Sequence, residues 1–314
     1  MDAVAGLLDG PRARGAFLLR SQLDPPWSMR IADEAPLCLI AITRGEAWLL
    51  PEDGEPLRLG RGDVAVIRGP DTYVLADHAG TEPQVVILPG QRCVTPDGQD
   101  VELISYMGVR TWGNSPVGST VMLSGTYELE GEVSRRLLRA LPSLLVLPGD
   151  SWESPLPGLL ADEIVKDDPG QEAVLDRLLD LLLIAVLRAW FARPDAQAPR
   201  WYRAYSDPVV GKALRLIHDD PAHRWTIAEL AAEAGVSRAA FARRFTELVG
   251  EPPMTFLTDW RLSLAADLLL EPGATIGSVA YEVGYATPFA LSTAFKRVRG
   301  VSPRQHRLAA TAGV

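Results

Sequence analysis

The sequence predicts an α+β chain of two domains, an N-terminal β-barrel with flanking helices and an all-α C-terminal domain that holds two helix-turn-helix units. Short apolar runs separated by Gly and Pro fill the first 130 residues, and one helix–turn–helix pattern occurs twice in the last hundred. A chain of 314 residues also exceeds what one core usually organises. We place the domains at residues 1–193 and 207–314, joined by a linker at 194–206.

The N-terminal domain is expected to consist of short strands. Residues 36–50 contain two apolar runs on either side of Arg44-Gly45, which indicates a hairpin. Further strands are expected at residues 57–59, 64–67, 85–88, 101–104 and 119–124. Many short strands at this spacing are typical of a sandwich or barrel.

Two helices are expected after the strands. Residues 131–148 predict a helix with a basic side, stopped by Pro142, and residues 169–191 predict a longer one. The apolar stripe of the longer helix is broad and comprises Val174, Leu178, Leu181, Leu182, Ala185 and Trp190. This helix either packs only on the barrel or also pairs with its equivalent in a second chain. Residues 193–206 then have the composition of an exposed connection.

The helical domain is organised around the segment from Trp225 to Phe245. Thr226 is expected to cap a helix, with Glu229 completing a capping box. Gly235 should form the turn, because the chain there needs a residue that tolerates positive φ. The second helix begins after Ser237 and should turn its two phenylalanines inward and its arginines outward, as a helix-turn-helix does when it lies in a DNA major groove.

The same layout returns from Thr275 to Arg297. The positions equivalent to those of the first unit are Thr275, Ile276, Val279, Ala280, Gly284, Thr287, Leu291 and Phe295. Residues 252–273 predict one long helix between the units, with two prolines at its start and Gly273 past its end. Two units tied by such a helix would face successive major-groove segments about one helical turn apart.

These motifs resemble a known family. Residues 207–308 are similar to the DNA-binding domain of AraC-type (AraC/XylS) transcriptional regulators, in Ala228, Leu230, Ala231, Gly235, Ser237, Ile276, Ala280, Gly284, Tyr285, Phe295, Lys296 and the tail GVSPRQHR. The N-terminal region resembles the cupin-like sensor domain of some of these regulators, in Pro26-Trp27, Gly45, Gly62-Asp63-Val64, Arg68-Gly69-Pro70 and residues 123–129. The resemblance implies a homodimeric regulator of promoter DNA that responds to a signal, acts with RNA polymerase and more often activates than represses.

The resemblance also implies which side chains of the first unit meet DNA. Ala239, Ala242 and Arg243 form the base-reading face, and Arg238 and Arg244 flank it. Arg243 is expected to read a guanine, because its forked donors match the O6 and N7 acceptors. The flanking arginines are expected to meet phosphate; the alternative for each is a solvated surface charge.

The second unit departs from this pattern. Its equivalent face carries Phe289, Ala290 and Thr293 and has no cation before Lys296 and Arg297. Such a face suits thymine methyl groups and groove shape. We therefore expect the first unit to set most of the sequence preference and the second to position the protein, through Lys296, Arg297, Arg299 and Arg304.

The charge of the chain is segregated in a way that fits one DNA-binding domain. Residues 200–314 carry 14 Lys and Arg against 11 Asp and Glu, a net charge of +3, whereas residues 1–199 carry 17 against 29, a net charge of −12. Only the helical domain is thus expected to meet phosphate. The start of the chain shows no secretory signal, the most apolar run is too short for a membrane span, and two cysteines provide no disulfide framework. We expect a cytoplasmic protein.

The alternative to a regulator is an enzyme. A cupin enzyme normally holds a metal with two or three His and a Glu, but the N-terminal region has only His78, and Tyr73 stands where the family often places a His. We therefore expect no catalysis, no metal and no cofactor. A DNA-repair protein with a similar double motif would need a cysteine cluster, and the helical domain has no Cys.

Candidate ligand residues in the barrel are Trp27, Trp48 and Tyr73, because aromatic side chains combine apolar area with a polar edge. The alternative is that each belongs to the core or the rim. Cys38 lies in an apolar run and is expected to be buried. Cys93 follows Arg92, whose charge would lower the thiol pKa, so Cys93 is a candidate redox sensor.

Overall fold

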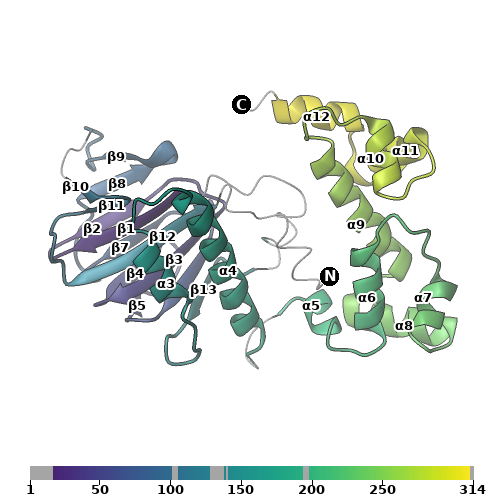
Figure 1. Cartoon of the computed structure of the whole chain (residues 1–314), viewed down its shortest axis with the longest axis horizontal. Helices are drawn as coiled ribbons and strands as arrows, with labels where there is room; N and C mark the ends of the chain where they lie inside the picture. Colours follow the sequence, from purple (N-terminus) through teal and green to yellow (C-terminus); the bar gives the residue numbers. More distant parts are fainter. Residues whose placement is uncertain (1–16, 101–104, 128–137, 139–140, 194–197, 312–314) are drawn as a thin grey trace. The chain divides into compact units, whose positions relative to one another are not determined.

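The computed structural model describes residues 17–100, 105–127, 138, 141–193 and 198–311. These residues fall into two compact units, one formed by the described residues within 17–127 and 141–193, and the other by residue 138 together with residues 198–311 (Figure 1). The N-terminal unit is rich in strands and the C-terminal unit is helical. No helix within the described ranges is long and apolar enough to cross a membrane.

The N-terminal unit contains two sheets that enclose its core. The first sheet has the order β10 (Ser105–Gly108), β11 (Thr111–Gly113), β1 (Phe17–Leu23), β12 (Thr120–Tyr127), β3 (Leu37–Arg44), β6 (Val64–Arg68) and β13 (Leu144–Leu147). The second has the order β5 (Leu57–Leu59), β4 (Ala47–Pro51), β7 (Tyr73–Ala76), β2 (Ser28–Ile31), β8 (Val85–Leu88) and β9 (Arg92–Val94). A short 3₁₀ turn, η1 (Pro89–Gln91), joins β8 to β9. Neighbouring strands are antiparallel except for the pairs β1–β11 and β2–β8.

The predicted hairpin at Arg44-Gly45 is wrong. Strands β3 and β4 are correctly placed in the sequence but lie in different sheets, where β3 pairs with β12 and β6, and β4 pairs with β5 and β7. Gly45 has a φ of 70° and lies so close to Ser119 that an added Cβ would come within 2.4 Å of the Ser119 carbonyl oxygen. The glycine therefore lets the chain cross from one sheet to the other.

The region after β12 also differs from its prediction. The helix expected at residues 131–148 lies mostly outside the described residues, and its last part is instead strand β13, which pairs antiparallel with β6. The run Leu144–Leu147 alternates between half-buried and buried side chains, as expected for a strand that covers one side of a core. The strand predicted at residues 101–104 lies outside the described residues.

Two helices accompany the barrel, α3 (Leu156–Glu163) and α4 (Gln171–Phe191). The bounds of α4 confirm the prediction, but its buried face is not the predicted stripe. The buried side chains are Gln171, Leu175, Leu179, Leu182, Leu183, Val186, Leu187 and Phe191, which include only Leu182 of that stripe. Leu179 approaches Gly125 so closely that a Cβ there would lie 2.7 Å from its Cδ1, and the Tyr127 hydroxyl donates to the Leu179 carbonyl oxygen at 2.9 Å.

The C-terminal unit consists of short helices arranged around one long helix. In chain order they are α5 (Arg200–Ala204), α6 (Val210–Asp219), α7 (Ile227–Glu233), α8 (Arg238–Val249), α9 (Pro253–Leu268), α10 (Ile276–Glu282), α11 (Pro288–Arg299) and α12 (Pro303–Thr311). Helix α9 confirms the predicted connection between the two units. Helix α5 falls inside the predicted linker, but its Ala204 is buried and Trp201 packs against the same core, so this part of the linker belongs to the helical unit.

Candidate nucleic-acid interface

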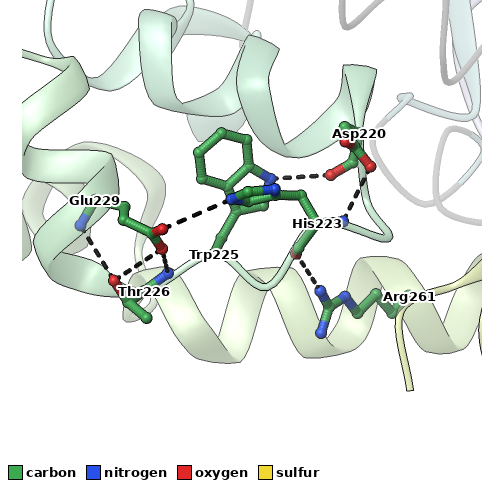
Figure 2. Close-up of polar contacts among 6 residues, drawn as sticks. All are labelled: Asp220, His223, Trp225, Thr226, Glu229 and Arg261. Carbon is green, nitrogen blue, oxygen red and sulfur yellow. Dashed lines mark hydrogen bonds and ion pairs between the residues drawn. The ribbon is translucent and has the colours of Figure 1, made fainter. Parts of the chain in front are cut away.

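The first helix-turn-helix unit begins with the predicted capping box. The Thr226 hydroxyl accepts a hydrogen bond from the Glu229 amide at 3.1 Å, and the Glu229 carboxylate accepts one from the Thr226 amide at 2.9 Å (Figure 2). Together these bonds satisfy two amides that the first turn of α7 would otherwise leave without a partner. The start of α7 is therefore fixed by two residues three positions apart.

The turn and the second helix of this unit also follow from their residues. Gly235 has a φ of 72°, which a residue with a Cβ adopts at a cost, and Ser237 accepts a hydrogen bond from the Ala240 amide at 3.3 Å at the start of α8. Phe241 and Phe245 are fully buried in the core that also holds Leu230 of α7. This packing fixes which face of α8 points outward.

The outward face of α8 presents the predicted DNA-reading side chains. Arg238 and Ala239 are exposed, and Ala242 is half-buried. Arg243 is 78% exposed, and its Nε lies 3.8 Å from the Glu247 carboxylate, one turn along the same helix. Arg244 is different, because it forms an ion pair with Asp207 at the start of α6. Arg238, Ala239 and Arg243 therefore lie together at the surface, while Arg244 has a partner inside the unit.

The second unit repeats this construction. Thr275 accepts from the Ser278 amide at 3.0 Å at the start of α10, and Thr287 accepts from the Ala290 amide at 3.1 Å at the start of α11. Gly284 forms the turn with a φ of 82°. The buried pair Leu291 and Phe295 takes the place of the two phenylalanines of the first unit. The predicted sequence repeat is thus a structural repeat.

The outward face of α11 differs in chemistry from that of α8. Phe289, near the start of the helix, is 81% exposed, and Thr293 is exposed one turn later. A shallow groove beside the same helix is lined by Ser292, Thr293, Lys296 and Arg297 of α11 and by Ser302, which follows it. Arg299 does not join this face, because it is half-buried and donates to the Ser263 hydroxyl on α9 at 3.0 Å.

The three aromatic residues proposed for the barrel occupy different positions. Trp27 is buried in the barrel core, and Trp48 is half-buried with its ring centroid 6.2 Å from that of His78. Tyr73 lines a small internal cavity of about 40 Å³ together with Cys38 and Trp112. The indole nitrogen of Trp112 is buried and has no hydrogen-bond partner among the described residues. Only one of the three predicted side chains, Tyr73, therefore reaches this cavity.

The two thiols have raised pKa values. Burial raises the pKa of Cys38 to about 12, as expected for a core thiol. Cys93 is half-buried, and burial also raises its pKa. This direction is opposite to the one that a neighbouring Arg92 charge would produce, and the Arg92 side chain is exposed. The redox role of Cys93 stays a prediction, but the lowering of its thiol pKa by Arg92, on which that prediction is based, is absent.

No group of three or more His, Cys, Asp or Glu that could hold a metal occurs in the described part of the chain.

Similarity to known proteins identifies the family. A family model described as a cupin matches residues 2–192, and one described as a helix-turn-helix domain matches residues 230–309. An AraC-like transcription regulator of Streptomyces antibioticus is 33% identical over 273 residues, which cover 85% of each chain. The chain belongs to the AraC family of transcriptional regulators. It combines an N-terminal cupin domain with a C-terminal DNA-binding domain.

Two further AraC-type proteins are similar to this AraC-family regulator. The transcriptional regulator AlkR of Acinetobacter baylyi is 26% identical over 98% of this chain and 99% of its own. The DNA-binding domain of AdpA, solved in complex with a target DNA, is 32% identical and covers 34% of this chain and 95% of that one, with a TM-score of 0.32.

Two residues that shape the interface of this AraC-family regulator are missed by sequence reasoning. Asp207 binds Arg244, 37 positions away in the sequence. Arg261 lies on α9 and donates to two carbonyl oxygens of the loop before α7. Figure 2 shows the one that belongs to His223. The sequence feature that could have indicated a role for Arg261 is its position as a single cation between Trp260 and Leu262, two apolar residues that are buried. A cation at such a position usually has a specific partner.

Proposed function

We propose that this AraC-family regulator is a dimeric transcription activator that binds promoter DNA mainly through the sequence preference of its first helix-turn-helix unit. The observation that carries this proposal is the outward face of α8, where Arg238, Ala239 and Arg243 are exposed above two fully buried phenylalanines. A small-residue and arginine face on a rigidly packed helix suits close approach to base edges. The protein is proposed to act in the cytoplasm and not as an enzyme.

Arg243 is the proposed base-reading residue. Its intramolecular partner Glu247 is 65% exposed and lies at the limit of an ion pair, 3.8 Å away. Exposed pairs of this kind contribute little to stability. Guanine O6 and N7 can therefore replace Glu247 as the acceptors of the Arg243 guanidinium, without cost to the fold of α8.

The other exposed cations are proposed to contact the DNA backbone. Arg238 lies at the first turn of α8, and Lys296 and Arg297 line the groove on α11. Their long, exposed side chains suit phosphate, which gives affinity without sequence information. Phe289 is proposed to meet thymine methyl groups, because its exposed aromatic ring offers no hydrogen bond to a base edge.

The barrel is proposed to be the signal-receiving domain. A volume of about 40 Å³ beside Tyr73 admits only a few water molecules. An effector larger than a few atoms therefore does not fit this cavity, whereas a larger pocket of about 210 Å³ lies on another side of Tyr73, lined also by Leu49 and Ile67. In the small cavity, a molecule with a hydrogen-bond acceptor would satisfy the indole nitrogen of Trp112. The alternative is that the barrel is a scaffold without a ligand.

Helix α4 is proposed to form the dimer with a second copy of the chain. Two apolar side chains on its open face, Val174 and Leu181, are 45% and 50% exposed, and Leu178 and Ala185 beside them are half-buried. The spacing between successive members of these four positions alternates between four and three residues. This is the spacing of the apolar seam between two paired helices. The opposite face of α4 is buried by its own chain, so this seam is available to a partner.

Selection of bound sequences from random DNA by the full-length chain, with and without cell extract, tests this function. We expect enrichment of a bipartite motif, with enrichment that changes when extract supplies an effector. In vitro transcription from the enriched site with RNA polymerase then distinguishes activation from repression. Failure to enrich any sequence would refute the DNA-binding proposal, and repression would refute the activator part.

A further inference from the structure

The two helix-turn-helix units do not share a hydrophobic core. The first core contains Phe245 and Trp260, whereas the second contains Leu262 and Phe295. Helix α9 contributes buried residues to both cores. Its half-buried Leu264 packs against both cores. A helix that rolls or bends between two separate cores would change the distance between α8 and α11. Something else must therefore contribute to the fixed placement of the two recognition helices.

The loop before α7 is well placed for this role, because it is itself rigid. The indole nitrogen of Trp225 donates to the Asp220 carbonyl oxygen at 2.9 Å, and the Asp220 carboxylate accepts from the His223 amide at 2.9 Å. The imidazole of His223 packs against the indole of Trp225, with ring centroids 4.1 Å apart and ring planes tilted by 53°, and its Nε2 lies 3.7 Å from the carboxylate of Glu229. Figure 2 shows how these contacts close the loop against the capping box.

Arg261 ties this loop to α9. Its Nε donates to the Pro221 carbonyl oxygen at 2.7 Å. Its terminal nitrogen donates to the His223 carbonyl oxygen at 2.6 Å (Figure 2). The guanidinium is half-buried, and burial lowers its pKa. An arginine nevertheless stays protonated, so both contacts are charge-assisted hydrogen bonds.

The turn of the second unit meets the same loop. A Cβ on Gly284 would lie 2.6 Å from the Ala222 carbonyl oxygen, 2.8 Å from the Ala222 Cα and 2.9 Å from a terminal nitrogen of Arg261. The equivalent turn glycine of the first unit, Gly235, has a similar φ, yet a Cβ there would meet nothing within 4 Å. Of these two turn glycines, only Gly284 therefore lies in close contact with the other unit.

We propose that Arg261 is a positioning residue that fixes the spacing between the two recognition helices. It does so at a joint formed by residues 221–223, Arg261 and Gly284, where the loop of one unit, the long helix and the turn of the other unit meet. The joint sets the number of base pairs that the regulator accepts between the two segments it contacts. This consequence rests on the proposed binding of both units to DNA, whereas the joint itself does not.

A distance measurement without DNA tests the joint. Spin labels are placed at the exposed positions Ala239 on α8 and Thr293 on α11 of the full-length chain, after Cys93→Ser has removed the half-buried thiol. The labelled chain is diluted with an excess of unlabelled chain, so that a dimer carries labels on one copy only. Double electron–electron resonance should then give one narrow distance distribution for this protein and a broad one for its Arg261→Ala variant. Arg261→Lys should give a distance distribution of intermediate width. The compact ammonium group of lysine lacks the planar, forked donors with which the guanidinium binds two carbonyl oxygens.

The turn glycines provide a second, matched pair of variants. Gly284→Ala and Gly235→Ala impose the same kind of backbone strain, but only the first places a methyl group against the joint. We expect Gly284→Ala to broaden or shift the distance distribution and Gly235→Ala to leave it narrow. A narrow, unshifted distribution in both Arg261→Ala and Gly284→Ala would overturn the proposal, and so would equal broadening by the two glycine variants.

Spacing tolerance on DNA tests the consequence. The bipartite site selected by the wild-type chain is compared with sites that carry one base pair more or fewer between the two segments. We expect Arg261→Ala to weaken binding to the selected site by about tenfold, because a loosely linked second unit has a lower effective concentration at its DNA segment once the first unit is bound. The variant should also discriminate less between the different spacings. Unchanged affinity and unchanged spacing preference would overturn the proposal. If the wild-type chain binds no DNA, the proposed function fails while the distance measurement still decides the joint.

Discussion

Arg244 on α8 and Asp207 at the start of α6 form a two-pronged ion pair. The Nε of Arg244 lies 3.0 Å from Oδ2 of Asp207, and its terminal nitrogen lies 2.6 Å from the same oxygen. The other oxygen of Asp207 accepts the amides of Val209 and Val210, which caps α6. Asp207 thus connects the recognition helix of the first unit to the helix that packs behind it. Arg244 therefore has a structural role that the sequence does not predict.

This pair predicts a stability difference that depends on pH. Burial raises the pKa of Asp207, but the Arg244 hydrogen bonds and the two amides outweigh it, and the net pKa lies below the ordinary value. A carboxyl with a lowered folded-state pKa stabilises the fold above its unfolded pKa of about 3.9 and loses that stabilisation as the pH falls through the folded-state pKa. We expect Arg244→Ala to lower the Tm near neutral pH and the difference from wild type to shrink below about pH 4.

Thermal unfolding of the full-length chain over this pH range checks the prediction. DNA selection by the same variant provides the control, because the base preference should be unchanged if Arg244 acts only within the fold. A loss of affinity with an unchanged Tm would show that Arg244 contacts phosphate instead.

Arg243→Ala should relax the preference at one base position. The loss of a bidentate contact to guanine is expected to cost about 1–3 kcal/mol at that position. Binding titrations on the selected site and on its single-base variants measure this value. Arg238→Ala is the matched control on the same helix and should weaken binding to all of these sites alike. Uniform weakening by Arg243→Ala would show that Arg243, too, contacts the backbone.

Replacement of Lys296 and Arg297 by Ala should reduce the salt dependence of binding. Each phosphate contact that is lost is expected to lower the slope of log affinity against log salt by about 1, with little change in base preference. Binding isotherms at several salt concentrations measure this slope. A changed sequence preference with an unchanged slope would contradict the proposed positioning role of the second unit.

Leu181→Glu should convert the proposed dimer into a monomer. Leu181 is 50% exposed on the open face of α4, where a buried carboxylate would face the equivalent helix of the second copy. Sedimentation velocity at micromolar concentration measures the change. Val117→Glu is the control, because Val117 is 79% exposed in the same unit but does not lie on α4. A wild-type chain that sediments as a monomer, with or without DNA, would refute the proposed interface.

Cys93→Ser should leave the response to oxidants unchanged. Burial raises the pKa of the thiol, so only a small fraction is thiolate, the reactive form, at neutral pH. A reporter assay with and without peroxide, on wild type and variant, measures this response. Loss of an oxidant response in the Cys93→Ser variant would instead support a redox role and show that the thiol is activated by a change of structure.

The sequence predicts those features that depend on residues close together in the chain. The capping box of Thr226 and Glu229 and the turn glycines at 235 and 284 act over a few positions, so their types and spacing are sufficient to predict the local structure. The same holds for the bounds of α4, for the start of α9 and for six of the strands, namely β3, β4, β5, β6, β8 and β12. The other seven strands in the described residues were not predicted, and α9 ends at Leu268, a few residues before the predicted end. Because the pattern occurs twice, the second copy supports the interpretation of the first.

The features that were missed depend on contacts between distant segments. Strands β3 and β4 are separated by two residues, yet they lie in different sheets and pair with other strands, and no local signal distinguishes this arrangement from a hairpin. Helix α4 is rich in apolar residues, so its sequence offers two faces that could be buried. Which of them is buried depends on the barrel surface around Gly125, which is not visible in the sequence of the helix. The partners of Arg244 and Arg261 likewise follow from tertiary packing.

The most direct test of the central claim is retardation of the selected DNA site by the full-length chain when each of its two segments is scrambled in turn. We predict that scrambling the segment read by α8 lowers affinity to the non-specific level, whereas scrambling the other segment causes a smaller loss. Equal losses from both segments would contradict the division of roles between the two units. Absence of retardation at low salt would contradict DNA binding itself.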